Sequence, residues 1–310
     1  MAQITNATLA TQAPIRFFPR HARLAVVEAR PTVQVVFLLR YVIGAASPAH
    51  AHAVSLLRLT AGGLAWWLAV IAAYLVNGVM DVKEDRANGS ARPIATGALP
   101  VRTAAALTAL AAVGSLVSAA WIPGLAVWVA AFLLLGWLYS APPLPAKRWS
   151  TACAVVVFGL GWTSFAGGAA TTGDGLSPAG LVAAGALSTW MALVGSVVKD
   201  LSDVDGDATG GRKTVAVRHG AASARALGVA GALIVGVCSV LASIAWAPST
   251  LIGTTVLAVG AVCVVVQILR TARVDPADKH RHRSAYRAFM RTQYVANSVL
   301  LLFALIRGSL

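Results

Sequence analysis

Long apolar runs constrain this chain more than any other feature. Nine such runs are separated by short polar loops, and they show no alternating strand pattern. About 20 apolar residues in a helix cross the hydrocarbon core of a bilayer, and backbone groups in lipid must pair within their own segment. The sequence therefore predicts an all-α polytopic membrane protein with nine transmembrane helices. The runs lie at residues 32–47, 54–77, 102–120, 122–140, 151–170, 178–198, 221–246, 249–270 and 287–306.

Composition supports a membrane protein and argues against a nucleic-acid-binding one. The chain is 58% hydrophobic and only 12% charged, which excludes an ordinary soluble domain. Its net charge of +14 is spread over the loops between apolar runs, with no separate basic module. The three cysteines stand singly in apolar runs, as small core residues do. We therefore expect membrane lipids as partners and no nucleic acid.

The positions of Lys and Arg predict an orientation in the membrane. Alternate loops, at 48–53, 121–124, 171–177 and 246–250, contain no Lys or Arg, whereas the others are basic. By the positive-inside rule, the N-terminus is cytoplasmic and the C-terminus lies outside. Abundant Ala, Val and Arg with little Lys is typical of proteins from GC-rich bacteria, so a bacterial cytoplasmic membrane is expected.

The first residues are predicted to differ from the rest of the chain. Residues 1–27 are expected to form a disordered or interfacial tail, and residues 28–310 the transmembrane domain. The early arginines, with no acid before Glu28, also leave an organellar transit peptide open.

Acidic residues are rare and gather in two places. Of the eleven Asp and Glu residues, seven follow directly on the second and sixth apolar runs. Both clusters fall on the predicted cytoplasmic side, so they can face each other across one cavity. Carboxylates at the mouths of membrane helices are costly unless something binds them. The clusters contain Asp81, Glu84 and Asp85, and then Asp200, Asp203, Asp205 and Asp207.

Spacing within each cluster predicts a metal site. Positions 77, 81 and 85 share one helix face, as do positions 200, 203 and 207. Mg²⁺ prefers oxygen ligands, with few protein carboxylates and the remainder from water and phosphate. We therefore expect two facing stripes that hold Mg²⁺ and a diphosphate, with Glu84 and Asp205 as bystanders. The predicted metal ligands are Asp81, Asp85, Asp200, Asp203 and Asp207, and Asn77 belongs to the same site.

Basic side chains near these clusters are candidates for binding the diphosphate. Arg and Lys stabilise charge that develops on a leaving phosphate group. The candidates are Arg92, Lys147, Lys199 and Arg212. Arg40 lies inside the first apolar run. Two alternatives stay open for it, namely binding an anionic acceptor or the diphosphate, and snorkelling to one membrane face.

These motifs, in this order, resemble the UbiA superfamily of intramembrane prenyltransferases. The resemblance covers nearly the whole chain. It is carried by Glu28-x-Arg30-Pro31, Asn77-x₃-Asp81-x₃-Asp85, Arg92-Pro93-Ile94, Tyr139-Ser140-Ala-Pro142-Pro143 with Lys147-Arg148, and Lys199-Asp200-x₂-Asp203-x₂-Gly206-Asp207 with Gly211-Arg212.

The resemblance implies nine helices around a central cavity open to lipid and capped by the two Asp motifs through Mg²⁺ and diphosphate. It implies ionisation of an isoprenyl diphosphate donor and attack by a small-molecule acceptor on the allylic cation. The Asp motifs and Asn77 would be catalytic, and Tyr139 and Ser140 would lie beside the allylic carbon or the diphosphate.

Four functions remain open on the sequence. The favoured one is a transferase acting on an aromatic or lipid-phase acceptor. A terpene cyclase (a lyase) would use the same Asp motifs and close the isoprenyl chain on itself. A phosphoribosyl-transferring relative is a third alternative. The fourth, a cation transporter, is disfavoured because it needs carboxylates near the bilayer midplane, whereas these lie at one mouth.

Overall fold

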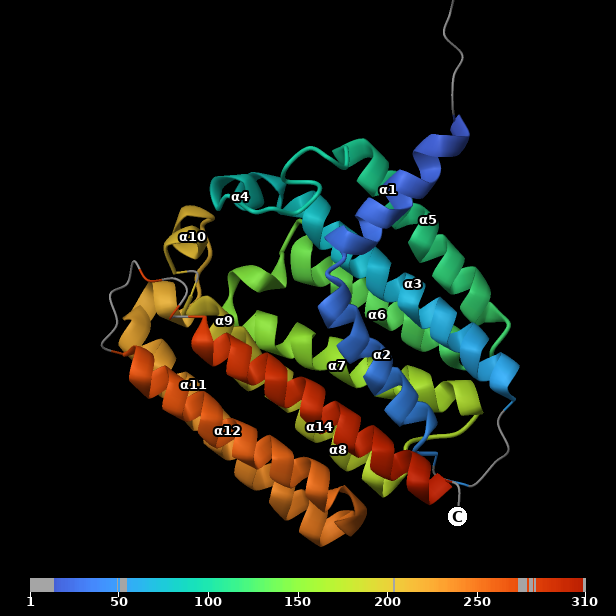
Figure 1. Ribbon diagram of the computed structural model, residues 1–310, viewed down its shortest axis with the longest axis vertical. Helices are drawn as coiled ribbons and strands as arrows, with labels where there is room; N and C mark the ends of the chain where they lie inside the picture. The colour runs from blue at the N-terminus through green and yellow to red at the C-terminus, as the bar shows by residue number, and fades with distance from the viewer. Residues whose placement is uncertain are drawn as a thin grey trace, which may run out of the picture.

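The structure is a computed structural model that describes residues 14–48, 50, 55–202, 204–272, 278, 281 and 283–308, so Asp203 lies outside the described residues. Throughout those ranges the regular secondary structure is helical, with no β-strand (Figure 1). The predicted all-α fold is confirmed for this part of the chain.

Seven helical segments are long and apolar enough to cross a membrane. The protein is therefore a multi-pass membrane protein. The segments are α3 (Leu56–Met80), α5 (Val101–Ala120), α7 (Ser150–Thr172), α8 to α9 (Pro178–Asp200), η3 with α12 (Pro248–Thr271), α11 (Val215–Trp246) and α14 (Ser284–Gly308).

The other two predicted spans are helices too, but shorter ones. They form α2 (Pro31–Ala45, 15 residues) and α6 (Leu125–Ser140, 16 residues). Each predicted apolar run thus corresponds to a helix, while length and composition identify seven of them as candidate spans.

The one large difference in a helix boundary has a local cause. Helix α11 begins at Val215, whereas its apolar run was predicted to begin at residue 221. Gly220 interrupts the helix with φ 82° and ψ 164°, a conformation that glycine adopts without a steric cost. The segment before this kink is a short turn capped by Thr214, whose side chain accepts a hydrogen bond from the Val217 N–H. The apolar helix proper therefore starts where the sequence placed it.

The described part of the N-terminal region is a helix, α1 (Pro14–Glu28), which packs against α3 and α5. His21 and Ala25 are buried on its inner face, while Arg20 and Arg23 are exposed. Residues 14–28 are thus helical, and the division into a tail at residues 1–27 and a transmembrane domain from residue 28 stays a prediction.

Helices α2 and α7 make an unusually close contact near their C-terminal ends. A Cβ atom at Gly44 or at Gly168 would run into the backbone of the opposite helix, at Phe165 and Tyr41 respectively. Such close approach of two backbones is typical of small residues between membrane helices. The α2–α7 contact therefore holds these two helices at a fixed separation.

Two short helices contain part of each acidic cluster. Helix α4 (Val82–Ala87) follows α3, and α10 (Val204–Thr209) follows α9 (Ser196–Asp200). In Figure 1 both α4 and α10 lie at the same end of the bundle. The fold thus brings together two segments that are far apart in the sequence.

Candidate active site

A cavity of about 220 Å³ lies between α2, α3, α6, α7, α9 and α14, with the π-helix η2 (Trp190–Gly195) also in its wall. One end is strongly polar, and the rest is mainly apolar and aromatic. The polar end is lined by Asn77, Asp81, Glu84, Asp85, Asn88, Lys147, Lys199, Asp200, Asp207 and Arg212. The apolar part includes Val33, Phe37, Ala73, Phe132, Val157, Leu160, Met191 and Met290.

The first acidic stripe is formed as the sequence predicted. Helical hydrogen bonding continues from Asn77 through Asp81 to Asp85, although Asp81 is the junction between α3 and α4. All three residues line the cavity. The Asn77 amide donates to Asp81 Oδ2 and to Ser140 Oγ, each at 3.0 Å. Ser140 is buried and does not line this cavity, and its predicted place beside the allylic carbon or the diphosphate stays a prediction.

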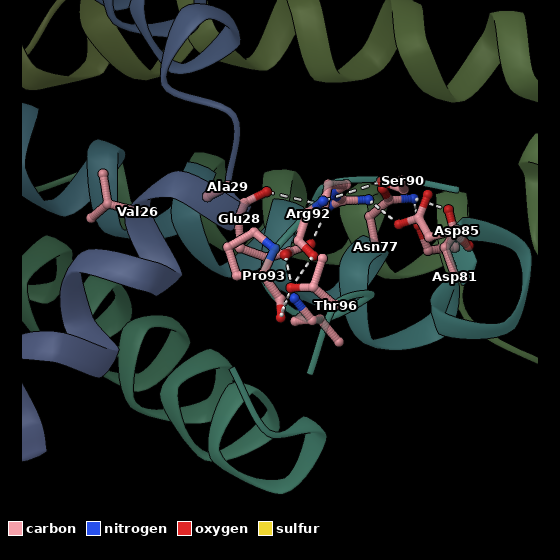
Figure 2. A network of polar contacts seen from close by, with 12 residues as sticks. Val26, Glu28, Ala29, Asn77, Asp81, Asp85, Ser90, Arg92, Pro93 and Thr96 are labelled. Atoms are coloured by element: carbon pink, nitrogen blue, oxygen red, sulfur yellow. Dashed lines mark hydrogen bonds and ion pairs between the residues drawn. The ribbon is translucent and has the colours of Figure 1, made fainter. Parts of the chain in front are cut away.

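A buried ion-pair network supports this stripe from behind (Figure 2). Arg92 bridges two carboxylates, with Nη1 at 2.8 Å from Asp85 Oδ2 and Nη2 at 2.7 Å from Glu28 Oε1. Glu28 is fully buried and also accepts a hydrogen bond from the Ile94 N–H at 2.9 Å. A Cβ atom at Gly78 would collide with Glu28 Oε1, so glycine at this position leaves the space that Glu28 occupies.

Lys147 is the cation in contact with the first stripe. Its Nζ donates to Asp81 Oδ1, and both side chains are largely buried. Burial lowers the pKa of Lys147 from its ordinary value, and the contact with Asp81 opposes that effect. A cation whose charge is partly desolvated interacts strongly with any anion that enters the cavity.

The second cluster joins the first through Arg212. Its Nη2 donates to Glu84 Oε2 at 2.8 Å, and its Nη1 lies 3.2 Å from Asp207 Oδ1. Burial lowers the pKa of Arg212, but the two carboxylates outweigh burial and raise the pKa above its ordinary value. Glu84 therefore lines the site and forms an ion pair with the Arg212 guanidinium, contrary to the expectation that it is a bystander.

The structure places the other predicted residues unevenly. Tyr139, Lys199 and Asp200 line the cavity, whereas Arg92 takes part in the network behind the first stripe. The second stripe is divided between α9, which ends at Asp200, and α10, which contains Asp207. The roles assigned to these residues, and to Asp203, stay predictions.

Sequence reasoning did not select Arg30 or η2 as parts of the site. Arg30 lines the cavity and has φ 54°, a left-handed conformation that is rare outside glycine. The sequence did contain a signal for Arg30, because the Glu28-x-Arg30-Pro31 motif is one of the motifs that carry the family resemblance. The π-helix η2 brings Met191 and Gly195 to the cavity wall, and the sequence had no visible signal for this irregularity.

The donor chemistry fits Mg²⁺. The oxygen-bearing side chains of both clusters line one cavity, and hard cations prefer such ligands. Within the described ranges no three acidic, His or Cys side chains form a ready-made metal site. Mg²⁺ needs only one or two protein carboxylates when a substrate phosphate and water complete its shell. Asp81, Asp85, Asp200 and Asp207 are the described residues that would hold it.

The fold and the site together define a multi-pass membrane protein with a cavity that is polar at one end and mainly apolar in the rest. Comparison with known proteins agrees. The UbiA prenyltransferase family profile matches residues 37–292, so the chain belongs to this family.

Solved structures share the fold. A UbiA homologue from Archaeoglobus fulgidus, bound to GPP and Mg²⁺, superposes with a TM-score of 0.70 over 93% of this chain and 100% of the homologue, at 20% identity. A structure of digeranylgeranylglyceryl phosphate synthase superposes with a TM-score of 0.68 over 94% of this chain and 99% of the other, at 15% identity.

Curated relatives match in part. The chain is 36% identical over 172 residues to digeranylgeranylglyceryl phosphate synthase of Halobacterium salinarum, covering 56% of this chain and 60% of the relative. It is 30% identical over 236 residues to a probable homogentisate phytyltransferase 2 of Oryza sativa, and this match covers 68% of this chain and 61% of the relative. The matches thus span about three fifths of the length of these relatives.

Proposed function

We propose that this protein is a Mg²⁺-dependent prenyltransferase that ionises an isoprenyl diphosphate within the membrane and transfers the prenyl group to an aromatic or lipid-phase acceptor. One observation carries the proposal. Two acidic clusters about 120 residues apart line a single cavity whose remaining walls are mainly apolar and aromatic. This arrangement suits a ligand with a highly charged head and a hydrocarbon tail.

The polar end would bind the diphosphate. Bound Mg²⁺ would supply charge neutralisation of the leaving diphosphate. Lys147 pairs with Asp81 and Arg212 with Glu84, and Lys199 lines the same polar end of the cavity. Their positive charges would contact phosphate oxygens, which Arg in particular binds through two parallel hydrogen bonds.

The apolar part of the cavity would keep water away from the allylic cation. The allylic C–O bond breaks with its electron pair going to the diphosphate, the acceptor bonds to the allylic carbon, and the acceptor loses a proton. The intermediate cation needs exclusion of water and benefits from aromatic faces. Phe37, Tyr74, Phe132 and Tyr139 line the cavity from three different helices and supply those faces.

The orientation in the membrane is part of the same proposal. Helices α2 and α6 would span together with the seven longer segments, which gives nine spans, a cytoplasmic N-terminus and an active site facing the cytoplasm. The alternation of basic and uncharged loops supports it, as does the position of α4 and α10 at one end of the bundle (Figure 1). Composition favours a bacterial cytoplasmic membrane.

The relatives favour a transferase over a cyclase. Two of the curated relatives are named for transfer to an acceptor, namely a probable homogentisate phytyltransferase 2 and coumarin 8-geranyltransferase 1. A cyclase of the same fold needs no second substrate, so the two activities give different products when the acceptor is left out.

The test uses purified, detergent-solubilised protein with Mg²⁺, geranyl, farnesyl or geranylgeranyl diphosphate, and mass spectrometry of the products. We expect donor consumption only when homogentisate or an isoprenylglyceryl phosphate is supplied, and loss of product in Asp81→Ala and Asp200→Ala. If a cyclic hydrocarbon forms without an acceptor, the protein is a terpene cyclase and the proposed transferase function is wrong. Donor turnover that persists in both variants would overturn both functions.

A further inference from the structure

The inner part of the cavity contains a polar pair that the proposed reaction does not use. Gln293 lies on α14 and lines the cavity. Its Oε1 accepts a hydrogen bond from Arg40 Nη2 at 3.0 Å. Arg40 belongs to α2, which packs directly against α14 (Figure 1). Arg40 is 0% exposed, so the guanidinium does not snorkel to a membrane face.

Arg40 has only uncharged hydrogen-bonding partners within the described ranges. Nη2 also donates to the Leu187 carbonyl at 2.8 Å, and Nη1 lies 3.4 Å from the sulfur of Met191. Its Nε is buried and has no partner. A guanidinium buried in a membrane protein without a counter-charge is costly. The surroundings of Arg40 therefore favour a nearby negative charge that those residues do not themselves provide.

Arg40 also determines which way the Gln293 amide faces. A guanidinium can only donate hydrogen bonds, so the amide oxygen must point toward it. The amide Nε2 then points away from Arg40, and within the described ranges it donates to no protein group. Because Gln293 lines the cavity, this N–H pair is available to a ligand there. The adjacent positive charge polarises the amide and strengthens it as a donor.

The pair lies away from the acidic clusters. Tyr286, Met290 and Gln293 share one face of α14 and all line the cavity. Gln293 is two turns further along the helix than Tyr286, which corresponds to about 10 Å. Phe37 and Met191 occupy the cavity wall next to Arg40. Helix α14 contacts α9, which ends at Asp200, and Figure 1 shows that it does so at the start of α14, where Tyr286 lies. An anion bound at Gln293 is therefore separate from a diphosphate bound between the Asp clusters.

We propose that Gln293, oriented and polarised by Arg40, binds an anionic oxygen of the acceptor, either a carboxylate or a phosphate. Gln293 is then a specificity-determining residue, and Arg40 is its positioning residue. The inference rests on the proposed transferase function, and it narrows the acceptor to molecules with a negatively charged oxygen.

The test measures equilibrium binding, so it does not depend on turnover. The probes are two matched pairs, homogentisate with its methyl ester and an isoprenylglyceryl phosphate with the corresponding isoprenylglycerol. Binding to the detergent-solubilised full chain is followed by calorimetry for the parent, Gln293→Glu and Gln267→Glu. The change at Gln293 preserves size and gives Arg40 a better partner, so folding is maintained, but it removes the donor amide and adds a negative charge. Gln267 lies on α12 outside the cavity lining and controls for the chemical change.

We expect the parent and Gln267→Glu to bind at least one charged probe about ten-fold or more tightly than its neutral partner, and Gln293→Glu to lose that preference. Binding of a farnesyl diphosphate donor with Mg²⁺ should stay within about two-fold in both variants. Three results would overturn the inference. The parent could bind the charged and the neutral probe of each pair equally tightly, it could bind neither charged probe, or Gln293→Glu could keep the preference for the charged probe. If product forms in the parent while the preference is absent, this inference fails and the transferase function stands. Donor turnover that is absent in the parent refutes the function alone.

Discussion

Arg212 Nη2 donates a hydrogen bond to Glu84 Oε2 at 2.8 Å, and the two residues stand 128 positions apart in the sequence. The same guanidinium reaches Asp207 with its other terminal nitrogen. Arg212 thus connects the loop of the second acidic cluster directly to the first cluster. Both partners are less than a quarter exposed, so solvent screens the contact only in part.

Breaking this connection should destabilise the site. We expect Glu84→Gln and Arg212→Gln each to lower the free energy of unfolding by about 1.5–3 kcal/mol, because each leaves a charged partner poorly paired. The double variant should lose less free energy of unfolding than the two single variants lose in total, since the contact that they share is lost only once. Thermal or denaturant unfolding of all four proteins in detergent measures the coupling. Strict additivity of the two single changes would show that the contact contributes nothing.

Gly78 should tolerate no side chain while Glu28 is present. In Gly78→Ala the new methyl group collides with the Glu28 carboxylate, and we expect a loss of about 1–3 kcal/mol from overpacking. Glu28→Ala alone should also be destabilising, because Arg92 loses its fully buried partner. In the combined variant the collision is absent. The measurement is therefore whether Gly78→Ala costs less in the Glu28→Ala background than in the parent, and an equal cost would contradict the steric explanation.

The first acidic stripe was predictable and the second only in part. Asn77, Asp81 and Asp85 continue a single helical path, so their spacing placed them on one face correctly. Asp200 and Asp207 meet at the cavity although a helix end lies between them. Periodicity carries no information on such a break. Likewise, the partnership of Glu28 with Arg92 joins residues far apart in the chain, and a single sequence shows no covariation that would pair them.

The fold was predictable because the hydrocarbon core imposes one rule on every span. Each apolar run became a helix, and the boundaries agree closely except at α11, where a short segment before the Gly220 kink precedes the apolar part. What the sequence could not provide is side-chain direction inside the bundle. Arg40 was visible as a charge within an apolar run, but only the packing of α2 against α14 shows that it contacts Gln293.

Mg²⁺ and diphosphate together should stabilise the parent protein. A ligand at about 100 times its dissociation constant adds roughly 2.7 kcal/mol, so we expect a clear rise in melting temperature with Mg²⁺ and pyrophosphate. Asp81→Asn and Asp207→Asn should lose most of that rise. Asp174→Asn is the matched control, because Asp174 lies in the loop between α7 and α8, bonded to the His50 and Gly175 N–H groups. A rise that survives in both cavity variants would argue against a metal site there.

Lys147 should be needed for turnover in its charged form. In Lys147→Met the buried Asp81 carboxylate loses its ion-pair partner, and the cavity loses a cation for the diphosphate. We expect kcat to fall by about 10²–10³, the usual cost of removing one electrostatic stabiliser of the transition state. Lys147→Arg, which keeps the charge, should retain more activity than Lys147→Met. Equal activity of the two variants would assign Lys147 a packing role alone.

The contact of α2 with α7 at Gly44 and Gly168 has a consequence for how this cavity can be altered. Because backbone meets backbone there, no exchange of side chains can bring the two helices closer together. Arg40 lies one turn before Gly44, so its guanidinium is presented from a wall whose position is set by main-chain geometry. Room for a longer or bulkier substrate can be made without touching this contact, by replacing side chains such as Phe132 and Met290 that line the cavity from α6 and α14. Directed-evolution libraries for new substrates should therefore randomise residues that line the cavity and leave Gly44 and Gly168 unchanged.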